Sequence, residues 1–251
     1  MVKRIGVLTS GGDAPGMNAA IRAVTRVALN SGIEVFGIYD GYKGMVEGYI
    51  EPLTKASVGE IIDRGGTILG SARLPEFKDP EVRAKAVTQL KKRGIEAVVV
   101  IGGDGSYRGA LALTEMGINC IGIPGTIDND ITCTDFTIGF DTALTTVVDA
   151  IDKLRDTSNS HHRCSIVEVM GNRCGDLALW AGISCGAEIV ITSDTGFEES
   201  EVLERLRDLD LIKKKRHAII VISEKITDVH QFAKKVSLNT GFSGRATILG
   251  H

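Results

Sequence analysis

Two aspartates, Asp128 and Asp130, lie two positions apart just after an apolar run that ends at Pro124. Such a run, followed by glycine and polar residues, is typical of a buried parallel strand and the loop at its carboxyl end, where α/β proteins bind their ligands. Two acids in this loop contribute nothing to packing. They therefore indicate a functional site.

A second loop of this kind follows the apolar residues 97–101 and reads GGDGS over residues 102–106. Asp104 offers the hard carboxylate oxygen that a magnesium ion bridging phosphates needs. Alternatively, Asp104 caps the helix that follows, since aspartate is a favoured N-cap residue. Because parallel strands end at one edge of a sheet, the two loops should converge there. Acid, glycine and hydroxyl together predict a site for a metal ion and phosphate.

Two further stretches fit a phosphate site less specifically. Residues 11–16 (GGDAPG) lie between an apolar strand and a helix, whose first N–H groups can bind phosphate; such turns also occur without a ligand. Arg73 follows a glycine-rich segment and could stabilise charge on a transferring phosphoryl group. The alternative for Arg73 is an ordinary solvated surface arginine.

Composition narrows the function classes. The chain has 251 residues, of which 43% are hydrophobic, a net charge of −3 and a pI of about 6.0. This balance indicates neither a nucleic-acid partner nor a polybasic membrane partner. The apolar run near the amino terminus is too short for a signal peptide or a membrane span. An odd number of cysteines without C-x-x-C spacing favours reduced thiols in the cytoplasm; they are Cys120, Cys133, Cys164, Cys174 and Cys185.

The elements that must position these loops alternate regularly. Apolar stretches predict strands at residues 4–10, 34–39, 97–101, 120–123, 164–169, 188–191, 218–223 and 246–249. Helical patterns lie at residues 15–31, 79–93, 106–116, 141–156, 175–185, 200–211 and 229–236. Strands alternating with helices predict an α/β fold of two doubly wound, mainly parallel sheets. We expect lobes at residues 1–138 and 139–251, with the active site in the cleft between them.

Taken together, these motifs resemble the bacterial ATP-dependent 6-phosphofructokinase family over almost the whole chain. The matching stretches are residues 8–13, 102–106, 124–130, 137–140, 151–157, 170–171 and 249–251. The resemblance implies a glycolytic kinase that transfers the γ-phosphoryl group of ATP to the 1-hydroxyl of fructose 6-phosphate, giving fructose 1,6-bisphosphate and ADP.

The resemblance also implies roles for residues of the two loops. Asp128 corresponds to the general base, and Thr126 lies beside the transferring phosphate. Asp104 would bind Mg²⁺, Asp130 would support the metal and the loop, and Arg73 would bridge the phosphates. The remaining nucleotide contacts would be Gly12, Tyr42, Gly103, Gly105 and Ser106.

On the sugar side, the resemblance implies that arginines and a histidine hold the 6-phosphate. These are Arg163, Arg245 and His251, while Glu224, Met170 and Gly171 would contact the sugar. In the family, Arg163 and Arg245 reach the neighbouring subunit's site, which implies a homotetramer with shared active sites. Taken singly, each arginine also fits a plain surface charge.

Two glycines bear on the phosphoryl donor. Relatives that use pyrophosphate tend to carry an aspartate at the position of Gly105 and a lysine at that of Gly125. Glycine leaves space for the α-phosphate and the nucleoside, whereas another carboxylate would repel them. The resemblance therefore favours ATP.

An effector site that binds ADP or phosphoenolpyruvate between subunits is also implied. The matching positions are Arg22, Arg26, Lys55, Arg155, Glu188, Lys213, Lys215 and His217. Lys55 stands where relatives often have arginine. The alternative for residues 213–216 is a solvated helix end.

Three features depart from the family pattern. Asn172 stands where arginine is usual, Lys225 stands where glycine is usual, and the family continues beyond His251. We expect lower stability and activity than in a longer relative. Two other hypotheses remain open: an impaired form that binds nucleotide or associates with full-length subunits, and another GGDG-type kinase acting on NAD or a lipid.

Overall fold

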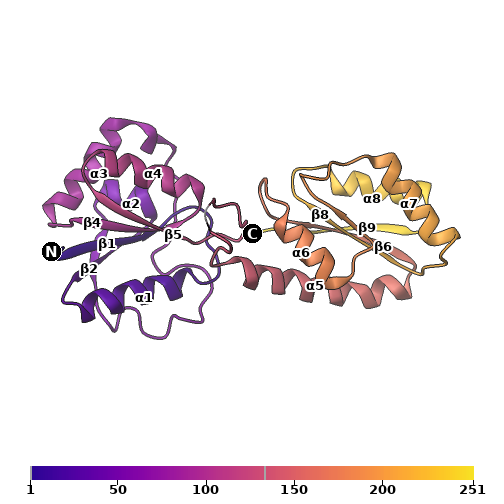
Figure 1. Cartoon of the computed structure of the whole chain (residues 1–251), viewed down its shortest axis with the longest axis horizontal. Helices are drawn as coiled ribbons and strands as arrows, with labels where there is room; N and C mark the ends of the chain where they lie inside the picture. Colours follow the sequence, from indigo (N-terminus) through magenta and orange to yellow (C-terminus); the bar gives the residue numbers. More distant parts are fainter. Residues whose placement is uncertain (1, 133) are drawn as a thin grey trace. The chain divides into compact units, whose positions relative to one another are not determined.

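The computed structural model describes residues 2–132 and 134–251, so Cys133 lies outside the described residues. The chain forms two compact units (Figure 1). The first comprises the chain up to Thr126 together with Ile131–Gly139, and the second comprises Ile127–Asp130 together with Phe140–His251. The short segment that carries Asp128 and Asp130 therefore belongs to the second unit, although both of its flanks belong to the first.

The first unit is built on a five-stranded sheet in the order β3-β2-β1-β4-β5. The strands β1, β2, β4 and β5 run parallel, and β3 pairs antiparallel with β2. The elements are β1 (Arg4–Thr9), α1 (Met17–Asn30), β2 (Glu34–Ile38), α2 (Gly41–Glu47), β3 (Ile50–Leu53), a 3₁₀ turn (Pro75–Lys78), α3 (Pro80–Lys92), β4 (Ala97–Gly102), α4 (Asp104–Glu115) and β5 (Asn119–Pro124).

Helices cover both faces of this sheet, with α2, α3 and α4 on one face and α1 on the other (Figure 1). One apolar core joins Leu8 of β1 and Val98 of β4 to Leu90 of α3 and Leu113 of α4, all of them fully buried. Since β4 is covered on both faces, it is a continuous apolar run rather than an alternating one.

The helix α2 and the strand β3 are absent from the sequence prediction. Gly41, Gly44 and Gly48 interrupt the apolar pattern of α2, yet Gly44 is required because a Cβ there would lie 1.8 Å from the Tyr39 carbonyl oxygen. Pro52 lies within β3, which is tolerated because β3 is an edge strand.

The second unit has a four-stranded sheet in the order β7-β8-β6-β9, with every adjacent pair parallel. Its elements are α5 (Phe140–Ser160), β6 (Arg163–Val169), α6 (Asp176–Cys185), β7 (Ile189–Ile191), α7 (Glu199–Leu211), β8 (Ala218–Ser223), α8 (Val229–Asn239) and β9 (Ser243–Leu249). The parallel α/β fold predicted from the sequence is thus confirmed in both units.

In this unit α5 and α6 lie on one face of the sheet, and α7 and α8 lie on the other (Figure 1). A separate apolar core fills each interface, and the central β8 is buried along its whole length. Among the described residues, no helix is both long and apolar enough to cross a membrane.

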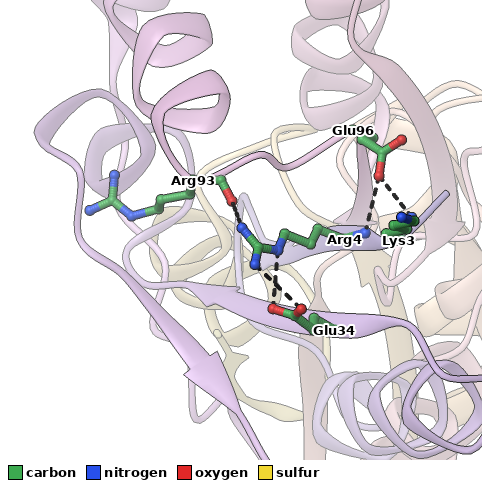
Figure 2. Close-up of polar contacts among 5 residues, drawn as sticks. All are labelled: Lys3, Arg4, Glu34, Arg93 and Glu96. Atoms are coloured by element: carbon green, nitrogen blue, oxygen red, sulfur yellow. Dashed lines mark hydrogen bonds and ion pairs between the residues drawn. The ribbon is translucent and has the colours of Figure 1, made fainter.

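Polar contacts join three strands of the first unit at their amino ends (Figure 2). The Arg4 guanidinium lies 3.1 Å from Glu34 on β2 and donates to the Arg93 carbonyl at 3.0 Å. A carboxylate oxygen of Glu96 accepts from the backbone N–H groups of Lys3 and Arg4. These bonds fix the start of β1 between β2 and β4, at the opposite end of the sheet from the loops predicted to bind phosphate.

Candidate functional site

The loops after β1 and β4 lie at the point where the strand order of the sheet reverses. From the neighbouring pair β1 and β4, the chain continues to β2 on one side and to β5 on the other, which is where open α/β sheets bind ligands. The Ser10 N–H donates to the Ile101 carbonyl at 3.0 Å, and the Ser106 hydroxyl donates to the Ser10 carbonyl at 3.1 Å. Gly102 packs against these two serines so closely that a Cβ there would lie 2.5 Å from the Ser10 carbonyl oxygen, so this position requires glycine.

The helix α4 begins with the residues predicted to bind phosphate and metal. Its N-cap is Gly103, which supplies no side-chain oxygen to the first turn. The alternative in which Asp104 caps this helix is therefore wrong: Asp104 is the first helical residue, and its carboxylate lies 2.8 Å from Arg108 one turn on. A helix start without a side-chain cap leaves N–H groups that can bind an anion.

Tyr42 forms a hydrogen bond to the first turn of α4. It lies on α2, is only 7% exposed, and donates its hydroxyl to the Ser106 carbonyl at 2.5 Å. Burial raises the pKa of Tyr42, so the phenol stays protonated and keeps this hydrogen bond. Gly109 makes room for the ring, since a Cβ there would lie 2.6 Å from it.

The glycine-rich segment that precedes Arg73 begins at residues 64–67 (RGGT) and is held beside the loop after β1. The buried amide of Asn18, on α1, donates to the carbonyls of Arg64 and Gly65 and accepts from the Ile68 N–H. Further along, the Ser71 hydroxyl donates to the Gly11 carbonyl. Arg73 itself is exposed. Asn18 was not predicted, although one polar residue on the buried face of α1 was a signal that could have identified it.

Thr126 follows β5 and lies beside the start of α4. The Gly125 N–H donates to the Gly102 carbonyl at 3.1 Å, and a Cβ at Gly103 would lie 3.7 Å from the Thr126 Cβ. The first unit thus carries every nucleotide-side residue that the sequence predicts: Gly12, Tyr42, Arg73, Gly103, Asp104, Gly105, Ser106 and Thr126.

Asp104 fits a magnesium site in which phosphate oxygens of a nucleotide supply some of the other ligands. Its side chain is 60% exposed on the first turn of α4. The described residues contain no group of three or more His, Cys, Asp or Glu side chains arranged to hold a metal ion. Mg²⁺ commonly takes only one or two protein carboxylates, with water and phosphate oxygens as its other ligands. A single exposed carboxylate is compatible with that chemistry.

Asp128 lies in the second unit among other acidic groups. Burial, followed by repulsion from Asp130 and Glu224, raises its pKa to about 6. Lys225 and His251 oppose this increase with smaller effects. Because their charges act on Asp128, the residues Asp130, Glu224 and His251 lie near it. The sequence predicts all four on the sugar side.

The two side-chain departures, Asn172 and Lys225, contact each other in this acidic cluster. The Lys225 ammonium donates to Asn172 Oδ1 at 2.9 Å, and Asn172 Nδ2 faces Asp130 Oδ2 at 3.4 Å. The Asn172 N–H donates to Glu224 at 2.8 Å. Both departing residues have left-handed backbone, with φ of 56° and 66°, so Lys225 adopts a conformation that glycine would adopt without strain.

Met170 and Gly171 follow β6 beside this network. The Glu224 N–H donates to the carbonyl of Val169, the last residue of β6, at 2.8 Å. Gly171 has a φ of 147°, and a Cβ there would lie 2.5 Å from the Cys174 carbonyl oxygen. Met170 packs partly against the core beneath α5 and α6.

The arginines predicted to hold the 6-phosphate lie elsewhere in the second unit. Arg163 is the first residue of β6. Arg245 lies on β9, in register with Ser165 of β6. Met170 and Glu224 lie at the carboxyl ends of β6 and β8. Since a strand rises about 3.3 Å per residue, Arg163 is about 20 Å along β6 from Val169. Within one chain, these arginines are therefore not brought together with the acidic cluster.

The predicted effector residues fall into two groups. In the second unit, Glu188 lies 2.8 Å from Lys215 and accepts from the Ile219 N–H, and both Glu188 and Arg155 influence the pKa of His217, which burial lowers. Lys213 is exposed. The first unit carries Arg22, Arg26 and Lys55, of which Arg22 donates to the Val58 carbonyl at 2.6 Å.

Comparison with known proteins identifies the family. Residues 4–251 match the family model described as phosphofructokinase. The chain is 60% identical over its full length to the ATP-dependent 6-phosphofructokinase of Photobacterium profundum and 62% identical to that of Aliivibrio fischeri, covering 78% of the length of each.

Solved structures agree. The phosphofructokinase of Saccharomyces cerevisiae matches 99% of this chain and 38% of its own, with a TM-score of 0.90 and 35% identity. A pyrophosphate-dependent phosphofructokinase from Marinobacter aquaeolei shares the fold, with a TM-score of 0.85 and 20% identity. The chain belongs to the phosphofructokinase family.

Proposed function

We propose that the protein transfers the γ-phosphoryl group of ATP to the 1-hydroxyl of fructose 6-phosphate, with Asp128 as the general base. The observation that carries this proposal is the environment of Asp128, whose pKa is raised to about 6 by burial and neighbouring acids. A carboxylate with a pKa near the working pH accepts a proton effectively and is still mostly ionised at pH 7. Relatives about 60% identical are named ATP-dependent 6-phosphofructokinases.

The first unit supplies the nucleotide side of the proposed reaction. The uncapped start of α4 and the loop after β1 would bind phosphate through backbone N–H groups. Asp104 would hold Mg²⁺, which supplies charge neutralisation on the phosphates when bound. Arg73 would add a positive charge, and Thr126 would lie beside the transferred group. Positioning and charge neutralisation account for most of the catalysis in phosphoryl transfer.

Two glycines support ATP as the donor. A Cβ at Gly105 would meet nothing within 4 Å, so the structure has open space where an α-phosphate and a nucleoside would lie. Gly125 is buried, and a Cβ there would lie 2.7 Å from Ile101 Cγ2. This backbone therefore does not accommodate the lysine that is usual in pyrophosphate-dependent relatives.

Shared active sites in a homotetramer are part of the same proposal. Arg163 begins β6, about 20 Å along the strand from Val169, and Arg245 on β9 is level with Ser165, about 13 Å from Val169. That position suits residues that bind the 6-phosphate at a neighbouring subunit's site. In their own subunit, Glu224, Met170 and Gly171 would bind the sugar and His251 the 6-phosphate. ADP or phosphoenolpyruvate would act at the effector residues, and the enzyme would work in the cytoplasm.

A coupled assay for fructose 1,6-bisphosphate, run with ATP and separately with pyrophosphate, tests the proposal. Product with ATP alone is expected. Asp128→Asn should abolish turnover and leave ATP binding almost unchanged, because the base is not a nucleotide ligand. If the protein binds ATP but makes no product with either donor, it is instead a nucleotide-binding or subunit-associating form of the family.

A further inference from the structure

We infer that Asp176 is a positioning residue for Asp128: its carboxylate holds Asn129, the residue between the two loop aspartates. This inference rests on the proposed function, because it concerns the placement of the proposed base. Asp176 carries no role in the sequence prediction. It is the first residue of α6.

Asn129 is held through its side chain and its backbone. Asn129 Nδ2 donates to Asp176 Oδ2 at 2.8 Å in a partly buried position, and the Cys174 thiol faces the Asn129 carbonyl oxygen at 3.8 Å. A hydrogen bond to a carboxylate is roughly twice as strong as one between neutral groups. The contact to Asp176 is therefore the stronger of the two.

The backbone of Asn129 needs such a contact. Its φ is 55°, in the left-handed region, which asparagine adopts more readily than most non-glycine residues but still at a cost in free energy, so contacts that hold it there stabilise the loop. Asn129 also lies in the four-residue segment Ile127–Asp130, which packs with the second unit although the chain on both sides of it belongs to the first. The segment is too short to form regular structure of its own, so its conformation depends on contacts to the second unit.

Asp176 is well placed to serve as an anchor. It begins a helix whose next residues, Leu177 and Ala178, are almost completely buried. The preceding Gly175 packs so closely that a Cβ would lie 2.6 Å from the Thr192 Cβ. The first turn of a helix also favours a negatively charged side chain. The carboxylate is thus fixed by packed backbone on both sides.

The contact of Asp130 with the same region is weaker. Asn172 Nδ2 lies 3.4 Å from Asp130 Oδ2, and Asn172 is exposed. Asn172 lies in the turn between β6 and α6, which is closed by a 2.8 Å bond from the Cys174 N–H to the Gly171 carbonyl, and Asp176 is the first residue of the helix that follows. Of these two contacts, the bond from Asp176 is shorter and less exposed, so it should contribute more to the placement of Asp128.

Steady-state kinetics of Asp176→Ala and Asp176→Asn test this inference, with Glu199→Ala as a matched control. Glu199 is also an acid in the first turn of a helix, α7, where it accepts a hydrogen bond from the Lys235 ammonium. Asp176→Ala should lower kcat about 10- to 100-fold with little change in KM for ATP, since a misplacement of about 1 Å can cost this much. Asp176→Asn keeps an acceptor oxygen and should restore most of the loss. Glu199→Ala should keep the full kcat.

Hydrogen–deuterium exchange provides a readout that needs no activity. Asp176→Ala should speed exchange of the peptide that contains Asp128, whereas Glu199→Ala should not. Combining Asp176→Ala with Asn129→Ala should lower kcat no further than either change alone. Unchanged exchange and unchanged kcat in folded Asp176→Ala, or additive losses in the double variant, would overturn the inference. Absence of product from the unaltered protein would count against the proposed function, and the exchange result would still decide the role of Asp176.

Discussion

Replacing Gly102 by alanine should disrupt the junction between the loops after β1 and β4. The added Cβ would lie 2.5 Å from the Ser10 carbonyl oxygen and 2.4 Å from Ser106 Oγ. Ordinary contact begins at 3.4 Å, so the Ser10 carbonyl would have to recede by about 0.9 Å. Ser106 can rotate away only by giving up its buried hydrogen bond to the same carbonyl.

The expected loss of stability follows from these two effects. Inserting a methyl group into a packed site costs about 1–3 kcal/mol. Losing the hydrogen bond adds about 0.5–1.5 kcal/mol. For a chain of this size, 1 kcal/mol corresponds to about 2–4 °C in Tm. The transition of the first unit should therefore fall by about 3–18 °C, and ATP affinity should fall about two- to tenfold as the phosphate loop moves.

Gly105→Ala is the matched control, since it adds the same methyl group three residues away. Nothing lies within 4 Å of its Cβ position, and Gly105 is inside α4. Alanine there should be neutral or stabilise the helix by up to about 1 kcal/mol. Thermal unfolding by circular dichroism and binding of a fluorescent ATP analogue measure both variants. If the two variants unfold at the same temperature, the close packing assigned to Gly102 is refuted.

Three further predictions concern acidic residues of the second unit. kcat/KM should fall as pH drops through about 6, because Asp128 becomes protonated there, and a profile flat from pH 8 to pH 5 would contradict its role as base. Since the pKa of this carboxyl is raised in the folded state, its ionised form costs stability above its unfolded pKa; Asp128→Asn should thus raise Tm at pH 8, with the gain vanishing toward pH 4. Glu188→Ala should destabilise the protein by about 1–3 kcal/mol in urea titrations, because it leaves the Ile219 N–H unpaired. Glu199 is more exposed than Glu188, so Glu199→Ala should lower the free energy of unfolding by less than about 1 kcal/mol. Equal losses of stability in the two variants would argue against this account of Glu188.

The predictable part of the fold is the part whose residues act locally. The strand at Ala97–Gly102 and the helix after it are visible in the sequence because an apolar run, a glycine turn and a helical pattern follow one another. The helix α2 is different, since its glycines are explained by a carbonyl oxygen that approaches Gly44 from Tyr39. A contact of that kind leaves no periodic signal.

The candidate site divides in the same way. Asp104 and Asp128 stand out because acids after buried strands have no packing role. Asn18 holds backbone groups 46 to 50 residues away, and Asp176 contacts Asn129 across 47 residues. Only the folded chain brings these partners together. A polar residue on the buried face of α1 could draw attention to Asn18, but the partners of Asn18 and Asp176 could not be inferred from residue type and spacing.

The assignment of Ile127–Asp130 to the second unit separates the two halves of the proposed chemistry along the chain. Burial raises the pKa of Asp128 most; the charged groups that act on it are Asp130 and Glu224, which raise it, and Lys225 and His251, which lower it, and all four lie within that unit. In the proposed reaction, the charged groups that set the basicity of Asp128 are therefore separate from the residues proposed to bind the nucleotide. Removing the positive charge of Lys225, which lowers this pKa, would then make Asp128 more basic without changing the residues proposed to select the phosphoryl donor.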